Sequence, residues 1–288
     1  MSDLVLVYVN YLEPKPPLNL TLKTLARFAA GYFNRWAPRQ STSIIRAAMT
    51  RQMNKGFYRL DLGITKCYLL ECSEGYLLID TAYPRDYEKF VKAIDKLVVG
   101  LYQIRYLLLT HHHDDHAGFA ARLVEQTGCK LIVHQNAVLP LSKGESENTM
   151  KPVNRCVRAA FSLFKMVHRE FRYSPLSMAD KDVVVSSEDF DLLKTIGIEG
   201  KILHTPGHSR DSISVVLSDG NAFVGDAAMN FLNFCGTKYR PIFVEDIDLV
   251  FDSWQKLAEH GAERIYPAHG NPFSAEKLTR YRKRFTGK

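Results

Sequence analysis

The sequence lacks any apolar run close to the roughly 20 residues that a membrane-spanning helix needs. It also lacks the basic start and the small-residue cleavage site of a secretory leader, so we expect no leader. The cysteines number only five and have no metal-site spacing, which predicts a reducing, cytoplasmic setting. No motif for a nucleotide, a flavin or a Ser-His-Asp triad is present. What remains is a chain of 288 residues, long enough to bury a full core.

The net positive charge of the chain comes from its first 60 residues. The first 60 residues hold nine Lys or Arg and two Asp or Glu, whereas the remaining residues hold 29 of each kind. This asymmetry predicts a basic N-terminal extension over residues 1–55. Within it, residues 22–36 form an amphipathic helical pattern that either packs on the rest of the protein, which we favour, or rests on an anionic membrane surface. No nucleic-acid motif accompanies the charge, so we expect no nucleic-acid partner.

Histidine and aspartate are concentrated between Thr110 and Gly118, a stretch with four histidines and two aspartates. It follows an apolar segment over 105–110 that is typical of a buried strand, so the stretch opens a loop at a strand end. In an extended turn His111 and His113 point to one side, while the Asp and His that follow turn toward a neighbouring point. Imidazole and carboxylate are ligands for zinc, iron and manganese. The pattern therefore predicts two adjacent metal ions; the alternative is a solvated polar loop.

Four further fragments place an Asp or a His directly after an apolar strand, often beside a glycine that allows a sharp turn. They are Ile79-Asp80-Thr81, His204-Thr205-Pro206-Gly207-His208-Ser209, Val224-Gly225-Asp226-Ala227-Ala228 and Tyr266-Pro267-Ala268-His269-Gly270. In this order, over about residues 57–285, the five fragments resemble the metallo-β-lactamase-fold superfamily.

The resemblance implies a ligand set for two divalent metal ions, with zinc first and iron or manganese as alternatives. One ion would be held by His111, His113 and His208, the other by Asp115, His116 and His269, with Asp226 bridging both. Asp80 matches a position that orients ligands without binding metal. His112 and Asp114 fall at variable positions of the motif, and we expect His204 to be structural.

The resemblance also implies an α/β fold, the four-layer αββα sandwich, over residues 56–288, with the N-terminal extension before it. A helical insertion over about 136–182 interrupts the expected pattern, and its long helix is predicted from Pro152 to about Tyr173. Cationic residues share one face of that helix: Arg155, Arg158, Lys165, Arg169 and Arg172. In this superfamily such insertions often cover the metal centre. The helix is therefore either a lid beside the substrate or a solvated charged face over a packed one.

The implied chemistry is hydrolysis by a hydroxide that two metal ions share, with Asp115 or Asp226 passing the proton to the leaving group. We expect a small substrate, anionic or acyl-bearing, with an ester-like bond: a carboxylic ester, a lactone or a thioester, and a phosphodiester second. A different class stays open, a low-turnover metal-binding regulatory or membrane-surface protein. The sequence does not set the oligomeric state.

Single residues indicate which branches of the superfamily the chain is similar to. Classical zinc β-lactamases carry a cysteine where this chain has Asp226, which argues against antibiotic hydrolysis. The sequence from Thr110 to His116 is similar to the corresponding motif of glyoxalase II. Lactonases carry a tyrosine where this chain has Met229, so Tyr239 or Tyr173 would have to replace that hydroxyl. We expect no role for Cys235, on the loop after Asp226.

Overall fold

The computed structural model describes residues 56–146, 150–167 and 171–286, with the side chains at 163–167 and 286 outside this description. The predicted N-terminal extension and its helix over 22–36 lie outside the described residues. None of the helices in the described ranges has both the length and the apolar character of a bilayer span.

The first sheet has six strands in the order β1-β2-β3-β4-β5-β7. Their bounds are β1 (Phe57–Asp61), β2 (Lys66–Cys72), β3 (Gly75–Ile79), β4 (Ile104–Leu108), β5 (Lys130–His134) and β7 (Val183–Val185). The strands β1, β2 and β3 are antiparallel, whereas β3, β4, β5 and β7 are parallel. Because parallel strands end at the same edge of a sheet, the loops after β3 and β4 emerge side by side.

The second sheet has five strands in the order β13-β12-β10-β9-β8. Their bounds are β8 (Gly200–His204), β9 (Ile213–Leu217), β10 (Asn221–Gly225), β12 (Arg264–Pro267) and β13 (Phe273–Ser274). The strands β10 and β12 are parallel neighbours, so the loops that follow them also leave from one edge.

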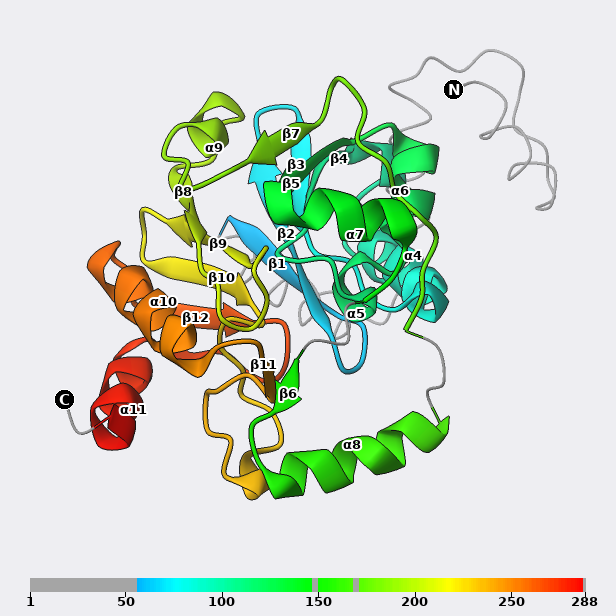
Figure 1. Ribbon diagram of the computed structural model, residues 1–288. Helices are drawn as coiled ribbons and strands as arrows, with labels where there is room; N and C mark the ends of the chain where they lie inside the picture. The colour runs from blue at the N-terminus through cyan, green and yellow to red at the C-terminus, as the bar shows by residue number, and fades with distance from the viewer. Residues whose placement is uncertain (1–55, 147–149, 168–170, 287–288) are drawn as a thin grey trace, which may run out of the picture. The chain divides into compact units, whose positions relative to one another are not determined.

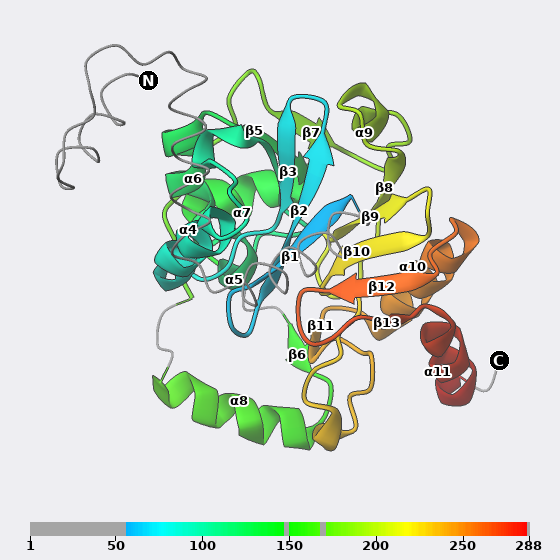
Figure 2. The same ribbon diagram turned by 180° about the vertical axis from the view of Figure 1, so that it is seen from behind.

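Helices cover the outer face of each sheet, and the two inner faces pack on each other (Figures 1 and 2). The first sheet carries α4 (Tyr87–Asp95), α6 (Ala120–Thr127) and α7 (Val138–Lys143), and the second carries α10 (Ile247–Glu259) and α11 (Glu276–Thr286). Short helical segments are η1 (Pro84–Asp86), η2 (Leu101–Gln103), α5 (Asp114–Ala117), η3 (Gln135–Ala137), α9 (Leu192–Thr195) and η4 (Asn233–Cys235). The predicted four-layer αββα sandwich is confirmed.

Three separate apolar clusters lie between these four layers. Alternate residues of one strand enter different clusters: in β2, Leu69 packs under the helices, whereas Tyr68 and Leu70 pack between the sheets. In β10, Phe223 packs between the sheets and Ala222 under α10 and α11. Both faces of these strands are thus buried, which explains why they appear in the sequence as continuous apolar runs.

The insertion contains α8 (Arg155–Val167), preceded by the short strand β6 (Lys151–Pro152), which pairs with β11 (Phe243–Val244) outside the two large sheets. The predicted extension of this helix to Tyr173 is wrong, because Arg172 instead forms a β-bridge with Glu145. Bridge pairing uses an extended backbone, which a helical residue does not have.

A disulfide joins Cys156 at the start of α8 to Cys235 in η4. Cys235 therefore has a structural partner that the sequence did not indicate, and the bond disagrees with the expected reducing setting. The bond links residues 79 positions apart in the sequence, so no local spacing signals it. Cys67 is a buried thiol and Cys72 a half-buried one, and both lie in β2.

Candidate metal centre

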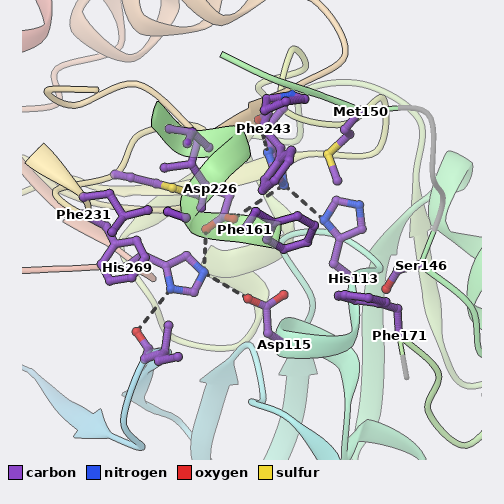
Figure 3. Close-up of a pocket in the computed structure, with 18 of the residues that line it drawn as sticks. His113, Asp115, Ser146, Met150, Phe161, Phe171, Asp226, Phe231, Phe243 and His269 are labelled. Carbon is purple, nitrogen blue, oxygen red and sulfur yellow. Dashed lines mark hydrogen bonds and ion pairs between the residues drawn. The ribbon is translucent and has the colours of Figure 1, made fainter. Parts of the chain in front are cut away.

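Each predicted ligand lies just after the carboxyl end of a strand or in the short segment that follows that strand. His111 and His113 follow β4, and the four-residue helix α5 carries Asp115 and His116. The remaining three come from the second sheet: His208 from the loop after β8, Asp226 directly after β10, and His269 just beyond β12. Figure 3 shows that side chains from both sheets meet at the floor of one cavity.

Three imidazoles form the first group of side chains. The Nε2 atom of His208 lies 3.2 Å from Nε2 of His111 and 3.1 Å from Nδ1 of His113. All three residues are buried, and one atom from each lies within 4.8 Å of the others, a spacing that a single metal ion can span. This is the trio that the family resemblance implied for the first ion.

The second group contains Asp115, His116 and His269, whose ligand atoms also lie within 4.8 Å of one another. Asp226 stands between the two groups. Its Oδ2 lies 3.5 Å from Nε2 of His208, and its Oδ1 lies 3.4 Å from Nε2 of both His116 and His269. One carboxylate thus faces both groups, the position that the sequence predicted for a bridging ligand.

Each ligand imidazole of the second sheet and of α5 is held through its outer nitrogen. The Nδ1 of His116 lies 2.9 Å from Oδ2 of Asp80, and that of His208 lies 2.8 Å from the Phe243 carbonyl oxygen. The Nδ1 of His269 lies 3.2 Å from the Ile64 carbonyl oxygen. A carboxylate or carbonyl only accepts, so each Nδ1 carries the hydrogen and each Nε2 presents a lone pair to the centre.

This arrangement fits a metal cation and fits poorly without one. The Nε2 of His116 and the Oδ1 of Asp226 are buried without a hydrogen-bond partner, although they lie 3.4 Å apart. Such orphaned atoms are costly in a protein interior unless something satisfies them. A cation between the two lone-pair-bearing groups satisfies both, and imidazole with carboxylate is a ligand set for zinc, iron or manganese.

The electrostatics divide the imidazoles into two kinds. Burial, followed by the neighbouring histidines, lowers the pKa of His111 and His113 well below its usual range, so both stay neutral as ligands must. Burial also opposes protonation of His116 and His269, but carboxylates, Asp226 foremost, outweigh it and raise both pKa values. For Asp226, burial is outweighed by His269 and His116, which hold its pKa below the usual range. The centre thus keeps an ionised carboxylate between its two groups.

The profile of the metallo-beta-lactamase superfamily matches residues 60–269, which contain all seven of these side chains. The chain belongs to the metallo-beta-lactamase superfamily. The sequence-based assignment to this superfamily is confirmed.

Relatives within the superfamily are distant. The Beta-lactamase-like protein 2 homolog of Drosophila melanogaster is 26% identical over 208 residues, which cover 72% of this chain and 59% of that protein. The Hydroxyacylglutathione hydrolase of Rhodopseudomonas palustris (strain HaA2) is 25% identical over 202 residues, covering 68% and 61%. The chain thus spans about six tenths of the length of these relatives. A solved metallo-beta-lactamase family protein from Thermus thermophilus shares the fold, with a TM-score of 0.59, 20% identity and coverage of 81% and 80%.

The histidines and aspartates that the sequence left out of the ligand set do lie outside both groups. His112 turns to Asp211, whose Oδ2 is 2.9 Å from its Nδ1. Asp114 bonds to Ser146 on the loop after α7. His204 stacks on His134 with ring centroids 4.2 Å apart. Asp211 was not singled out by sequence, because the contact that gives it a role bridges 99 residues.

Asp80 takes the position expected of an orienting residue in this superfamily. It is buried, and besides His116 it accepts bonds from the Thr110 amide at 2.7 Å and the Thr110 hydroxyl at 2.8 Å. Its φ of 60° lies in the left-handed region, which aspartate and asparagine tolerate better than most residues. The loop after β3 thus fixes both the start of the histidine motif and one of its imidazoles.

A cavity of about 560 Å³ opens above the candidate metal centre, and its lining includes Met229. The tyrosines proposed to replace a hydroxyl at this position lie elsewhere: Tyr173 donates to the His112 carbonyl, and Tyr239 packs on Phe273. Tyr83, three residues after Asp80, lines the cavity instead. Burial, then the charge of Asp115, raises the Tyr83 pKa, so that the cavity wall contains a protonated tyrosine. Its nearness to the first motif was the available sequence signal.

Proposed function

We propose that this chain is a dinuclear metal-dependent hydrolase that cleaves a carboxylic ester, a lactone or a thioester of a small substrate. The supporting observation is Asp226, whose two oxygens face the two ligand groups at 3.4 to 3.5 Å. The proposed ligands are His111, His113, His208, Asp115, His116, His269 and Asp226. A relative named Hydroxyacylglutathione hydrolase supports hydrolysis at an acyl group.

Two divalent ions, zinc first with iron or manganese as alternatives, would supply a hydroxide at neutral pH and polarise the substrate oxygen. The chain itself orients the ligand imidazoles through Asp80 and two backbone carbonyls. Asp115 lines the cavity and its side chain is 18% exposed, so its carboxylate can take up the released proton and pass it to the leaving group.

The experiment is a panel of lactones, carboxylic esters, glutathione thioesters and phosphodiesters, assayed with metal-saturated protein. Asp226→Ala is expected to lower turnover and metal content by more than about 100-fold, because losing a residue that only supports a ligand already costs about 10- to 100-fold. Asp95→Ala, an exposed aspartate at the end of α4, is the matched control and keeps wild-type values. Circular dichroism verifies that both variants are folded.

Each result selects one interpretation. Turnover of one bond type that Asp226→Ala removes supports the proposal and names the bond. Turnover of phosphodiesters alone replaces ester hydrolysis with phosphodiester hydrolysis. Unchanged activity in Asp226→Ala refutes the metal mechanism, and metal binding without turnover favours a regulatory protein.

A cytoplasmic location stays a prediction. The Cys156–Cys235 bond argues against it, because disulfides persist mainly in oxidising compartments. Membrane contact through residues 22–36 likewise stays a prediction, and co-sedimentation of the full chain with anionic vesicles tests it.

A further inference from the structure

We propose that the cavity above the metal centre holds an unbranched aliphatic acyl chain, so that the substrate is an ester or thioester of a medium or long fatty acid. This inference rests on the proposed function and adds the substrate class. It concerns the part of the cavity that the ligand set does not occupy.

The walls of that part are mainly apolar and come from two segments of the chain. The first segment includes Met150, α8 and Phe171, and the second includes the loop after β10 and β11. The apolar side chains they contribute include Met150, Val157, Phe161, Phe171, Phe231 and Phe243. Figure 3 shows these aromatic rings gathered around the ligands His113, Asp115 and His269. A substrate bound at the metal centre must therefore extend along apolar walls.

Aromatic rings lie next to the ligands in two separate sets. The ring centroids of Phe231 and His269 are 5.9 Å apart. The carbonyl of Phe243 holds His208, and the Phe243 ring lies 4.5 Å from that of Phe161, which lies 5.9 Å from Phe171. An acyl group whose carbonyl carbon is attacked at the metal centre can place its chain against these rings.

These side chains are not closed into a core. Phe161, Phe171, Phe231 and Phe243 are all only half-buried, although a folded chain gains free energy by burying such rings. Three ties hold the two wall segments in place: the pairing of β6 with β11, the Cys156–Cys235 bond, and a 2.9 Å bond from the Asn154 side chain to the Cys235 carbonyl. The space is thus preformed, and its size of about 560 Å³ is within the range of small-molecule pockets.

The same walls disfavour a polar substrate. A glutathione group brings two carboxylates and two peptide groups, and each needs a partner when it leaves water. Among the described lining residues, Arg158 is the single Lys or Arg, and it is exposed. A hydrocarbon chain needs no such partners, so the cavity fits the acyl side of a substrate better than a glutathione leaving group.

The first test is a series of 4-nitrophenyl esters from acetate to decanoate, below their micelle concentrations, with metal-saturated protein. The expected kcat/KM rises about fourfold per added methylene group until the cavity is full, since each buried methylene contributes its transfer free energy. S-acyl glutathione and simple alkyl thioesters of equal acyl length are compared in parallel. A flat or falling series with measurable turnover overturns the inference while leaving the hydrolase proposal intact.

Two tryptophan substitutions at adjacent residues of α8 test where the acyl chain binds. Ala160 lines the cavity and Ala159 is exposed and does not. Ala160→Trp fills the cavity and is expected to lower kcat/KM for decanoate at least tenfold more than for acetate. Ala159→Trp keeps the wild-type series. Equal effects of the two variants, or an equal loss at all chain lengths in Ala160→Trp, contradict the assignment.

A binding assay keeps the inference testable if no ester is hydrolysed, a result that would refute the proposed function instead. Anilinonaphthalene sulfonate is bound to the full chain and displaced with straight alcohols from butanol to decanol or with S-methylglutathione. Displacement that strengthens with chain length, and weakens in Ala160→Trp alone, supports an acyl chain pocket. Displacement by S-methylglutathione but not by decanol refutes it.

Discussion

Asp80 is not one of the proposed ligands, but its side chain accepts a hydrogen bond from the ligand His116. We predict that Asp80→Asn weakens the binding of one metal ion. In the wild type, the Oδ2 atom of Asp80 forces the hydrogen of His116 onto Nδ1, at 2.9 Å. Asparagine presents an amide NH₂ at that place, so Nδ1 must become the acceptor and the hydrogen moves to Nε2. A protonated Nε2 cannot bind metal.

The expected size of the effect depends on which contacts of Asp80 an asparagine can keep. The amide oxygen of asparagine can still accept from the Thr110 amide, and the Thr110 hydroxyl can rotate to accept from the new NH₂ group. The φ of 60° suits asparagine as well as aspartate. The two Thr110 contacts can therefore be kept, whereas the His116 contact forces the hydrogen off Nδ1. Metal affinity is expected to fall about 10- to 100-fold, or about 1.4 to 2.8 kcal/mol.

The assay is competition for zinc with a chromophoric chelator, which resolves the two sites by their dissociation constants. One constant is expected to rise and the other, assigned to His111, His113 and His208, to stay near the wild-type value. Asp86→Asn is the control: Asp86 is also buried and its carboxylate pairs with Lys89 at 2.6 Å, away from the proposed ligands. Two unchanged constants in Asp80→Asn would refute the argument about the His116 hydrogen.

Two further predictions concern stability. Cys156→Ser is expected to lower the free energy of unfolding by about 2–4 kcal/mol, measured by urea titration, with Cys72→Ser as the thiol control; equal midpoints for all three proteins contradict it. Burial, followed by the charge of His204, lowers the pKa of His134 in the folded chain. Below about pH 6.5 the unfolded chain therefore binds a proton at this histidine more readily than the folded chain does. The stability of the metal-saturated wild type relative to His134→Gln should therefore fall between about pH 7.5 and 5; a constant difference would exclude this titration.

The sequence pattern indicated that each proposed ligand lies at a strand end within a short motif, and the family resemblance implied that these ends meet. His111, for example, closely follows the end of an apolar strand, and the parallel neighbours β3 and β4 end at the same edge. Such a position depends on local pattern and on the fold, and both could be predicted. Strands that are buried on both faces could also be predicted, because their sequences are continuous runs of apolar residues.

What the sequence did not predict depends on contacts between distant segments. The bond from Cys156 to Cys235 joins two irregular parts of the chain, whose spacing carries no periodic signal. The stacking of His134 on His204 likewise depends on where β5 and β8 end relative to each other. The helix after Pro152 was predicted too long because the apolar period continued, while Arg172 found a strand partner in Glu145. Tertiary pairing overrode local propensity there.

The walls of the cavity and the proposed ligands come from different parts of the chain, and this separation matters for protein engineering. Segments 150–167 and 229–244 are joined to each other by strand pairing and by the disulfide. One of their contacts with the ligand set is the Phe243 carbonyl, which holds His208. A backbone carbonyl is available from any residue at that position. The two segments are therefore natural units for exchange as a pair between members of the superfamily, with the aim of transplanting substrate preference onto an unchanged set of metal ligands.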